Sequence, residues 1–299
     1  MLESRLGEFA ALLTAFCWTF GALAFESACK LAGSSAVNFI RLVMALILLS
    51  LFCLIYRGSF LPLDATSRAW FWLFLSGVIG FALGDFFLFR AFETMGARIS
   101  MLIMASVPPM TALIGWAVLS ETLTSSAIIG MALTVSGIII AVSGRKTHLS
   151  GMKKRYTVAG VLFAFGGAVG QAVGLVLSKL GMGDYDPFAA TQIRIIAAII
   201  GFSLILFLLK EWPKVGAALS NGRAIIPTSI GAVLGPFLGV SLSLLAIQHT
   251  TTGVASTIMA IVPVLIIPPA IVLFKERVTV REVVGALSAV MGVSILFLR

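Results

Sequence analysis

The stretch Met104-Ala-Ser-Val-Pro-Pro-Met-Thr-Ala-Leu-Ile-Gly-Trp-Ala-Val-Leu-Ser-Glu-Thr-Leu-Thr124 returns in altered form 155 residues later, as Met259-Ala-Ile-Val-Pro-Val-Leu-Ile-Ile-Pro-Pro-Ala-Ile-Val-Leu-Phe-Lys-Glu-Arg-Val-Thr279. The same shift pairs Gly130 with Gly285, and a shift of 153 pairs Arg41 with Arg194. The chain therefore contains an internal duplication. In an apolar protein, such a duplication is typical of secondary transporters, whose substrate site lies between two related halves.

The composition indicates a membrane protein. Of the 299 residues, 60% are hydrophobic and only 11% are charged, against about 25% charged residues in soluble domains. The net charge of +9 comes from basic residues in short gaps between apolar runs. Basic residues at such places are typical of contacts with lipid headgroups and of signals that set the membrane topology, and they do not predict nucleic-acid binding.

Ten apolar runs are long enough, or nearly so, to cross a bilayer, which takes about 20 residues. They lie at residues 6–25, 37–56, 70–91, 99–119, 126–143, 156–178, 188–209, 224–247, 253–274 and 282–298. The first run lacks a basic leader, so we expect it to be a retained helix and no cleaved signal peptide. We expect a first repeat over 1–143, a basic connecting loop over 144–155 and a second repeat over 156–299.

Five helices in each repeat have a geometric consequence. An odd number makes the second copy enter the membrane from the opposite side, so the repeats are predicted to have inverted topology. One fold used in two orientations supports alternating access, in which a central site opens to one face and then to the other. The predicted fold class is thus all-α and integral to the membrane, with ten transmembrane helices.

The duplicated segment resembles the EamA-type branch of the drug/metabolite transporter superfamily. The resemblance rests on Ala105 to Thr124 and Ala260 to Thr279 with the glycines that follow each, and it extends over nearly the whole chain. It implies a secondary transporter of small organic metabolites such as amino acids, purines or drug-like compounds. It favours export as the direction. We also expect a location in the inner (plasma) membrane, a monomer or weak dimer, no cofactor and, because catalytic motifs are missing, no enzymatic activity.

Pro108 and Pro263 fall in the middle of the fourth and ninth predicted helices. A proline there removes a backbone hydrogen bond and favours a kink. Within a bilayer, such breaks are tolerated where neighbouring groups or a water-filled cavity satisfy the freed carbonyls. The two prolines are therefore candidates for a hinge or gate, with ordinary structural kinks as the alternative.

Three charged residues lie inside predicted spans: Arg41, Asp85 and Arg194. Charges at such depth are costly and usually face a cavity or a partner. The arginines could snorkel to the headgroups, close a gate against a carboxylate, or receive a substrate carboxylate. Asp85 could form a salt bridge to Arg41 or Arg90, or could couple transport to protons or bind a cation. Its repeat mate is Val240, so this charge breaks the repeat.

Further candidates for substrate contact are Trp18, Asn38, Gln171 and Gln192. Trp18 could stack on a substrate or serve as a core residue, and Gln171 takes its place in the second copy. The three amides could bond to substrate or across helices. Glu121 and Glu276 precede Thr124 and Thr279, which can cap the next helix; proton transfer is the alternative for the two acids.

Motifs for other functions are missing. Cys17, Cys29 and Cys53 have no metal-ligand spacing, so we expect neither a disulfide nor a metal site. The chain lacks a Gly-x-Ser-x-Gly, a His-Glu-x-x-His and a Walker A sequence. The alternatives to a carrier are a channel or facilitative pore and, more remotely, an intramembrane enzyme.

Two arguments from the sequence disagree on which side of the membrane the termini lie. Fourteen Lys and Arg lie after the odd-numbered spans and five lie on the opposite side, which by the positive-inside rule places both termini outside. The family resemblance implies both termini in the cytoplasm.

Overall fold

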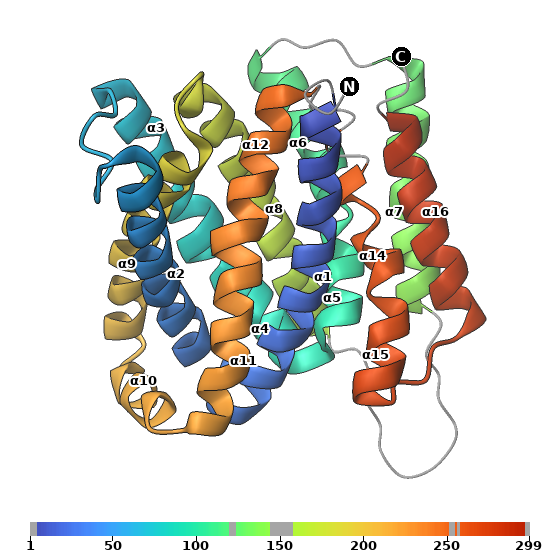
Figure 1. The fold of residues 1–299 in the computed structure, drawn as a ribbon. Coiled ribbons are helices and arrows are strands. Elements are labelled where there is room, and N and C mark those ends of the chain that lie inside the picture. The colour runs from blue at the N-terminus through green and yellow to red at the C-terminus, as the bar shows by residue number, and fades with distance from the viewer. Residues whose placement is uncertain (1–4, 120–123, 144–157, 251–254, 256–257, 297–299) are drawn as a thin grey trace.

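The computed structural model describes residues 5–119, 124–143, 158–250, 255 and 258–296, and every regular element in these residues is a helix. The helices form a bundle, and the chain termini lie at the same end of it (Figure 1). The expected connecting loop at 144–155 and Glu121 lie outside the described residues.

The first half contains five consecutive helical segments. The third is one continuous rod in which a π-helical segment, η2, joins α3 to α4, and the fourth is interrupted between α5 and α6. The elements are α1 (Leu6–Ala32), α2 (Ser34–Arg57), α3 (Ser67–Ser76), η2 (Gly77–Gly84), α4 (Asp85–Met95), α5 (Ala97–Met104), α6 (Val107–Leu119) and α7 (Ser125–Ser143).

The second half repeats this order with one addition, the short helix α10. Its third segment again contains a π-helix, η3, at nearly the position equivalent to η2. The elements are α8 (Val158–Met182), α9 (Pro187–Leu208), α10 (Trp212–Leu219), α11 (Gly222–Ala232), η3 (Val233–Val240), α12 (Ser241–His249), α14 (Val262–Leu265), α15 (Ile267–Phe274) and α16 (Val280–Leu296).

Eight helices in the described residues are long and apolar enough to cross a membrane, from Leu6–Ala32 to Gly222–His249. The ninth expected span contains the shorter apolar stretch Val262–Phe274, and the tenth corresponds to α16, of 17 residues. The all-helical, multi-spanning fold is as predicted, whereas ten crossings stay a prediction. The sequence did not predict α10 or the two π-helical segments.

Close glycine contacts join the two halves. A Cβ atom on Gly170 of α8 would lie only 2.5 Å from the Cα of Gly84 in η2, and one on Gly174 would lie 2.9 Å from the Cα of Gly80. A Cβ atom on Gly21 of α1 would lie 3.5 Å from the backbone nitrogen of Gly235 in η3, and this pair is the repeat equivalent of Gly174 and Gly80. Small residues let helix backbones approach closely inside a membrane, so each π-helical segment packs on the first helix of the other half.

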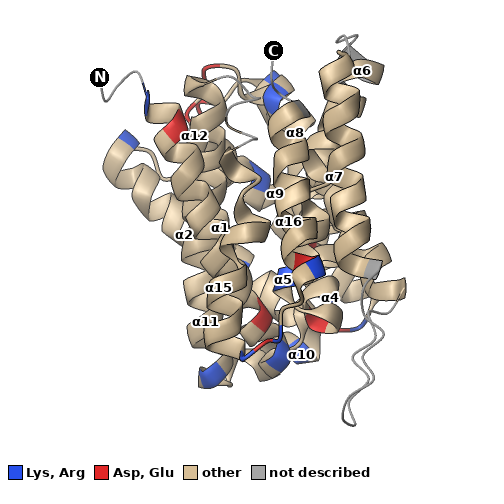
Figure 2. Ribbon diagram, turned by 90° about the vertical axis from the view of Figure 1, so that its right-hand side faces the viewer, with Lys and Arg blue, Asp and Glu red and all other residues tan. Residues whose placement is uncertain are grey.

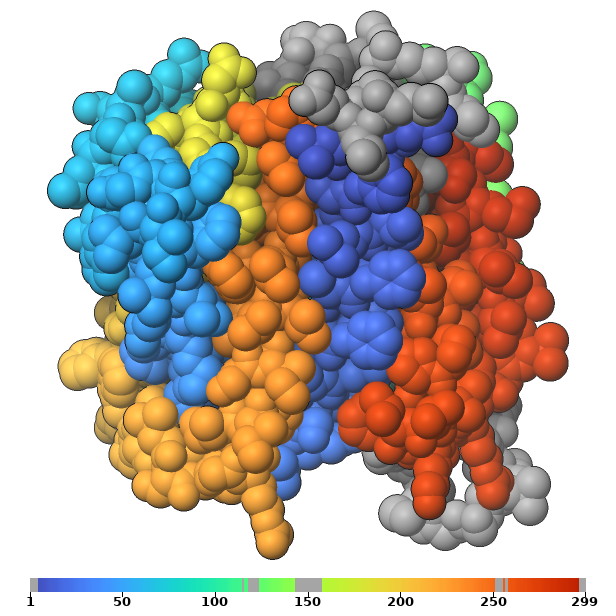
Figure 3. Space-filling model, in the orientation of Figure 1, coloured from blue at the N-terminus to red at the C-terminus, as the bar shows by residue number. Residues whose placement is uncertain are grey.

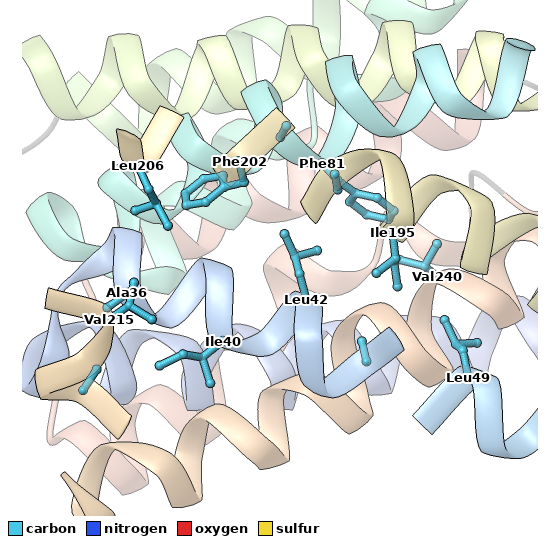
Figure 4. Close-up of a cluster of buried hydrophobic side chains, with 14 residues drawn as sticks. Ala36, Ile40, Leu42, Leu49, Phe81, Ile195, Phe202, Leu206, Val215 and Val240 are labelled. Atoms are coloured by element: carbon cyan, nitrogen blue, oxygen red, sulfur yellow. The ribbon is translucent and has the colours of Figure 1, made fainter. Parts of the chain in front are cut away.

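A buried apolar cluster holds α2 against α9 (Figure 4). Leu42 and Ile195, the residues directly after Arg41 and Arg194, both belong to it and are fully buried. Leu49 and Phe202, which are also repeat equivalents, extend it along the same two helices. The core thereby fixes the two helices that carry the intramembrane arginines.

The outer surface is apolar. Large exposed side chains on it include Phe9, Ile47, Ile129, Phe207 and Val272, whereas most charged residues lie near the two ends of the bundle (Figure 2). On the face shown in Figure 3, α1 lies between α11 to α12 on one side and α14 to α16 on the other. Such a surface fits contact with lipid.

Candidate functional site

A cavity of about 190 Å³ lies between the two halves. Its walls come from the first four helical segments of each half, and the described parts of α7 and α16 contribute no lining residue. The sequence offers seven candidates for substrate contact and two prolines for a hinge or gate. Seven of these nine residues line the cavity: Trp18, Arg41, Asp85, Pro108, Gln171, Arg194 and Pro263. The duplication therefore brings equivalent elements of both halves around one central space.

Both proline-containing segments are interrupted where they border the cavity. α5 ends at Met104 and α6 begins at Val107, just before Pro108. Ser106 bonds back to Ile103 rather than to Leu102, as in a tighter helical turn. The ninth segment has turns at Ala260, Ile261 and Ile266, on both sides of Pro263. At the expected kinks the regular helical hydrogen bonding is interrupted by short turns, and whether these places act as hinges stays a prediction.

Asp85 and Arg41 form a buried ion pair at the cavity wall. The Arg41 Nε donates to Asn38 Oδ1 at 2.8 Å, and the Gln171 amide donates to Asp85 Oδ1 at 2.9 Å. The Arg41 guanidinium also lies over the Phe89 ring, 4.5 Å from its centroid. Of the two salt bridges considered for Asp85, the structure contains the one to Arg41. Residues from both halves thus surround one carboxylate.

Arg194 lies on the same cavity but in a different environment. It is 3% exposed, as is Arg41, so neither arginine snorkels to the headgroups in this structure. The Arg194 guanidinium lies over the Phe81 ring at 4.4 Å, and its Nε has no hydrogen-bond partner. Two equivalent arginines therefore have different partners.

Aromatic and sulfur-containing side chains form much of the remaining wall. Trp18 lies against Gly239 of η3, where a Cβ would come within 2.7 Å of the indole Nε1. Phe25, Phe89, Met101 and Met104 line the cavity as well. This wall suits an apolar or aromatic body of a ligand. Sequence reasoning missed these phenylalanines and methionines, because nothing distinguishes them from the many others in the chain.

Asn38 and Gln192 do not line the cavity. Asn38 reaches the cavity wall only indirectly, by accepting the hydrogen bond from Arg41 Nε. The Gln192 amide nitrogen donates to Ser50 Oγ at 2.8 Å and to the Phe60 carbonyl at 2.7 Å. These bonds join α2 and α9 away from the cavity, so they agree with the alternative of a bond across helices, and direct substrate contact by Gln192 stays a prediction.

A second charged cluster lies at the end of the bundle opposite the termini, where α5, α15 and α16 meet (Figure 1). Arg98 donates to Glu276 at 2.6 Å and lies 3.1 Å from Glu282. Glu282 also accepts from the Thr279 backbone N–H at 2.8 Å, in the pattern of a capping box.

Thr124 likewise accepts from the Ala127 N–H at 3.2 Å. The capping roles expected of the two threonines are present, while Glu276 serves as an ion-pair partner.

Glu211 is charged at the same end, in the turn before α10. It lies 3.2 Å from Arg90. Burial raises the pKa of Glu211, but hydrogen bonds from Lys214 and Ser35 and the charge of Arg90 outweigh it and hold the pKa below the ordinary value of a glutamate. Arg90 is thus engaged by Glu211, which leaves Asp85 to Arg41.

Comparison with known proteins agrees with this geometry. A model of the EamA-like transporter family matches residues 5–143 and matches again over residues 158–298. The chain belongs to the EamA-like transporter family. No curated protein is significantly similar in sequence to it.

Solved structures also share the fold, with 28 chains matching significantly. One of them, described as "Crystal structure of protein", has a TM-score of 0.67 and 17% sequence identity and covers 97% of this chain and 95% of its own. At this identity the likeness concerns the fold alone. The family assigns a multi-pass membrane transporter of the drug/metabolite type built from two EamA repeats, and it points away from an enzyme. No group of three or more potential metal ligands occurs in the described residues.

Proposed function

We propose that this protein is a secondary transporter that carries small organic metabolites through the central cavity by alternating access. The observation that carries the proposal is the origin of the cavity walls, which come from the first four segments of both repeats. Secondary transporters bind substrate at such a repeat interface, where discontinuous helices meet. The breaks before Pro108 and around Pro263 supply two discontinuous helices at this place.

The size of the cavity limits the substrate. Drug-sized ligands occupy pockets of about 300–1,000 Å³, and this cavity has about 190 Å³. Amino acids, purines and comparably small compounds fit better than bulky drugs. The ligand contacts that we propose are made by Trp18, Arg41, Asp85, Gln171 and Arg194, with Asn38 positioning Arg41.

The same proposal includes the repeat architecture. Ten helices in two inverted five-helix repeats, over 1–143 and 156–299 with a connector at 144–155, would place the first helix of each repeat in opposite directions. Rocking of one unit against the other then opens the cavity to either face. We further propose export as the direction, with a proton on Asp85 as the coupling element.

The location proposed is the inner (plasma) membrane, with a monomer or weak dimer as the working unit. The charge bias favours termini outside, and the family resemblance favours termini inside. A reporter fused after Arg299 distinguishes these orientations, because only one side of the membrane supports its activity.

Counterflow in proteoliposomes tests the function. The purified full chain is reconstituted with unlabelled amino acids, purines or small organic acids inside and tracer outside, and a carrier gives transient, saturable accumulation. Met104→Trp, which narrows the cavity, should abolish it, whereas Leu13→Trp on the lipid-facing side of α1 should leave it intact. Flux that does not saturate would instead support the channel alternative.

A further inference from the structure

In the described residues, the guanidinium of Arg194 makes no direct ion pair, although Asp85 attracts it from a longer distance. It is almost fully buried and lines the cavity, its Nε makes no hydrogen bond, and no ion pair to it occurs in the described residues. It rests between the Phe81 ring and Gly80, where a Cβ would lie 3.5 Å from its Nη2. Ring contact of this kind orients a guanidinium without neutralising it. The charge is therefore held in place at a cavity whose carboxylate, Asp85, pairs directly with Arg41 and not with Arg194.

The duplication shows where that counter-charge would be. In the first half, Arg41 of the second segment pairs with Asp85 of the third. In the second half, Arg194 occupies the position of Arg41, and the position of Asp85 is occupied by Val240, which also lines the cavity. Both halves therefore contain the arginine of this ion pair, but only the first half contains the carboxylate.

The charge balance of the cavity agrees with this asymmetry. Among the described residues, the charged ones that line it are Arg41, Asp85 and Arg194, which together carry one net positive charge when Asp85 is ionised beside Arg41. An unpaired buried cation is costly, and such groups in membrane proteins usually mark substrate or ion sites. One negative charge from a bound molecule would complete the balance.

We infer that the molecule bound in this cavity is a small organic monoanion, a carboxylate on an apolar or aromatic body, whose carboxylate pairs with Arg194. The planar guanidinium can receive a carboxylate through two parallel hydrogen bonds. The apolar body lies against Trp18, Phe25 and the neighbouring methionines. This inference rests on the proposed function, since it names the substrate class of the same site.

The first test needs no ligand. Arg194→Gln removes an unpaired buried charge, so the melting temperature of the ligand-free protein in detergent should rise. Arg41→Gln removes the partner of Asp85 and should lower the melting temperature. If Arg194→Gln lowers it as much as Arg41→Gln does, Arg194 is a structural residue and the inference is overturned.

The second test uses three probes with one phenyl body: 3-phenylpropionate, its amide and 3-phenylpropylamine. The carboxylate alone should raise the melting temperature of the wild type, because a ligand that binds only the folded state stabilises it. Arg194→Gln should weaken the binding of 3-phenylpropionate at least ten-fold. Arg57→Gln, which removes an arginine paired with Asp64 outside the cavity, should not change it.

A third variant supplies the missing carboxylate from the chain. Val240→Asp places an acid at the position equivalent to Asp85, so it should raise the ligand-free melting temperature and remove the response to 3-phenylpropionate. Equal or absent responses to the three probes in the wild type would overturn the inference. Saturable counterflow of an amine without carboxylate binding would overturn it too while leaving the transporter function standing. Carboxylate binding at Arg194 without any counterflow would overturn the transporter function and leave the inference about the bound molecule standing.

Discussion

At the scale of single residues, the chain uses one ancestral arginine position in two ways. Arg41 is part of a satisfied ion pair with Asp85, supported by Asn38 and Gln171. Arg194 lies on the same cavity over an aromatic ring and makes no direct ion pair with a carboxylate of the described residues. The difference follows from one position, Asp85 in the first repeat and Val240 in the second. The asymmetry of the repeat is therefore concentrated at the candidate site.

Asp85 can be tested as the coupling residue. Asp85→Asn keeps the shape of the side chain but removes the charge and the proton, so uptake driven by a pH gradient should disappear while counterflow at equal pH remains. Proteoliposomes with and without an imposed gradient give both readings from one preparation. Asp64→Asn, which changes an acid outside the cavity, should behave as the wild type. If Asp85→Asn still concentrates substrate along the gradient, Asp85 is not the coupling site.

At the scale of helices, two features determine how the elements meet: glycine contacts and proline breaks. Gly84 and Gly170 bring η2 and α8 to backbone contact. The breaks beside Pro108 and Pro263 border the cavity from opposite repeats. The glycine contacts fix how closely the two halves approach, and we propose that the proline segments are the places where they bend.

Gly170→Ala should destabilise the protein by about 1–3 kcal/mol, as overpacking of a tight contact does. The added Cβ would lie 2.5 Å from the Gly84 Cα, so the two backbones must separate. The matched control is Gly216→Ala in α10, where the space is open and the effect should be near zero or slightly stabilising. Chemical unfolding in detergent measures both. An unchanged stability of Gly170→Ala would show that α8 and η2 are not in the contact described.

Pro263→Ala tests the hinge. The variant regains a backbone N–H that can close the helix across the break, so turnover in transport assays should fall several-fold while substrate affinity stays similar. Pro227→Ala is the control, since this proline lies inside α11 and does not line the cavity. Turnover equal to that of the wild type would identify the break at Pro263 as a structural kink.

Much of this element-level structure could be predicted from the sequence. Apolar runs and Gly or Pro positions predicted the helices and their breaks, because backbone hydrogen bonds must be satisfied inside a bilayer. The π-helical segments η2 and η3 could not be predicted, since they depend on packing against α8 and α1. For the same reason, the depth and residue type of Gln192 predict a place in the site, whereas its side chain bonds to Ser50 and Phe60 and does not line the cavity. Which face a residue presents is decided by tertiary contacts.

At the scale of the whole molecule, two repeats enclose one cavity from equivalent elements. The family match over 5–143 and 158–298 agrees with the duplication visible in the sequence. Alternating access requires that this single space open to each face of the membrane in turn. The charged cluster around Arg98, Glu276 and Glu282 lies at one end, where separation of α5 from α15 and α16 would break its ion pairs.

Accessibility of the cavity from the two faces of the membrane tests this account most directly. Ser243 lines the cavity and is buried, so Ser243→Cys is introduced after Cys17, Cys29 and Cys53 are replaced by alanine. A membrane-impermeant maleimide is then applied to right-side-out and to inside-out vesicles that hold a pH gradient. The account predicts labelling from both faces without loss of the gradient. Labelling confined to one face under every substrate and pH condition would contradict it.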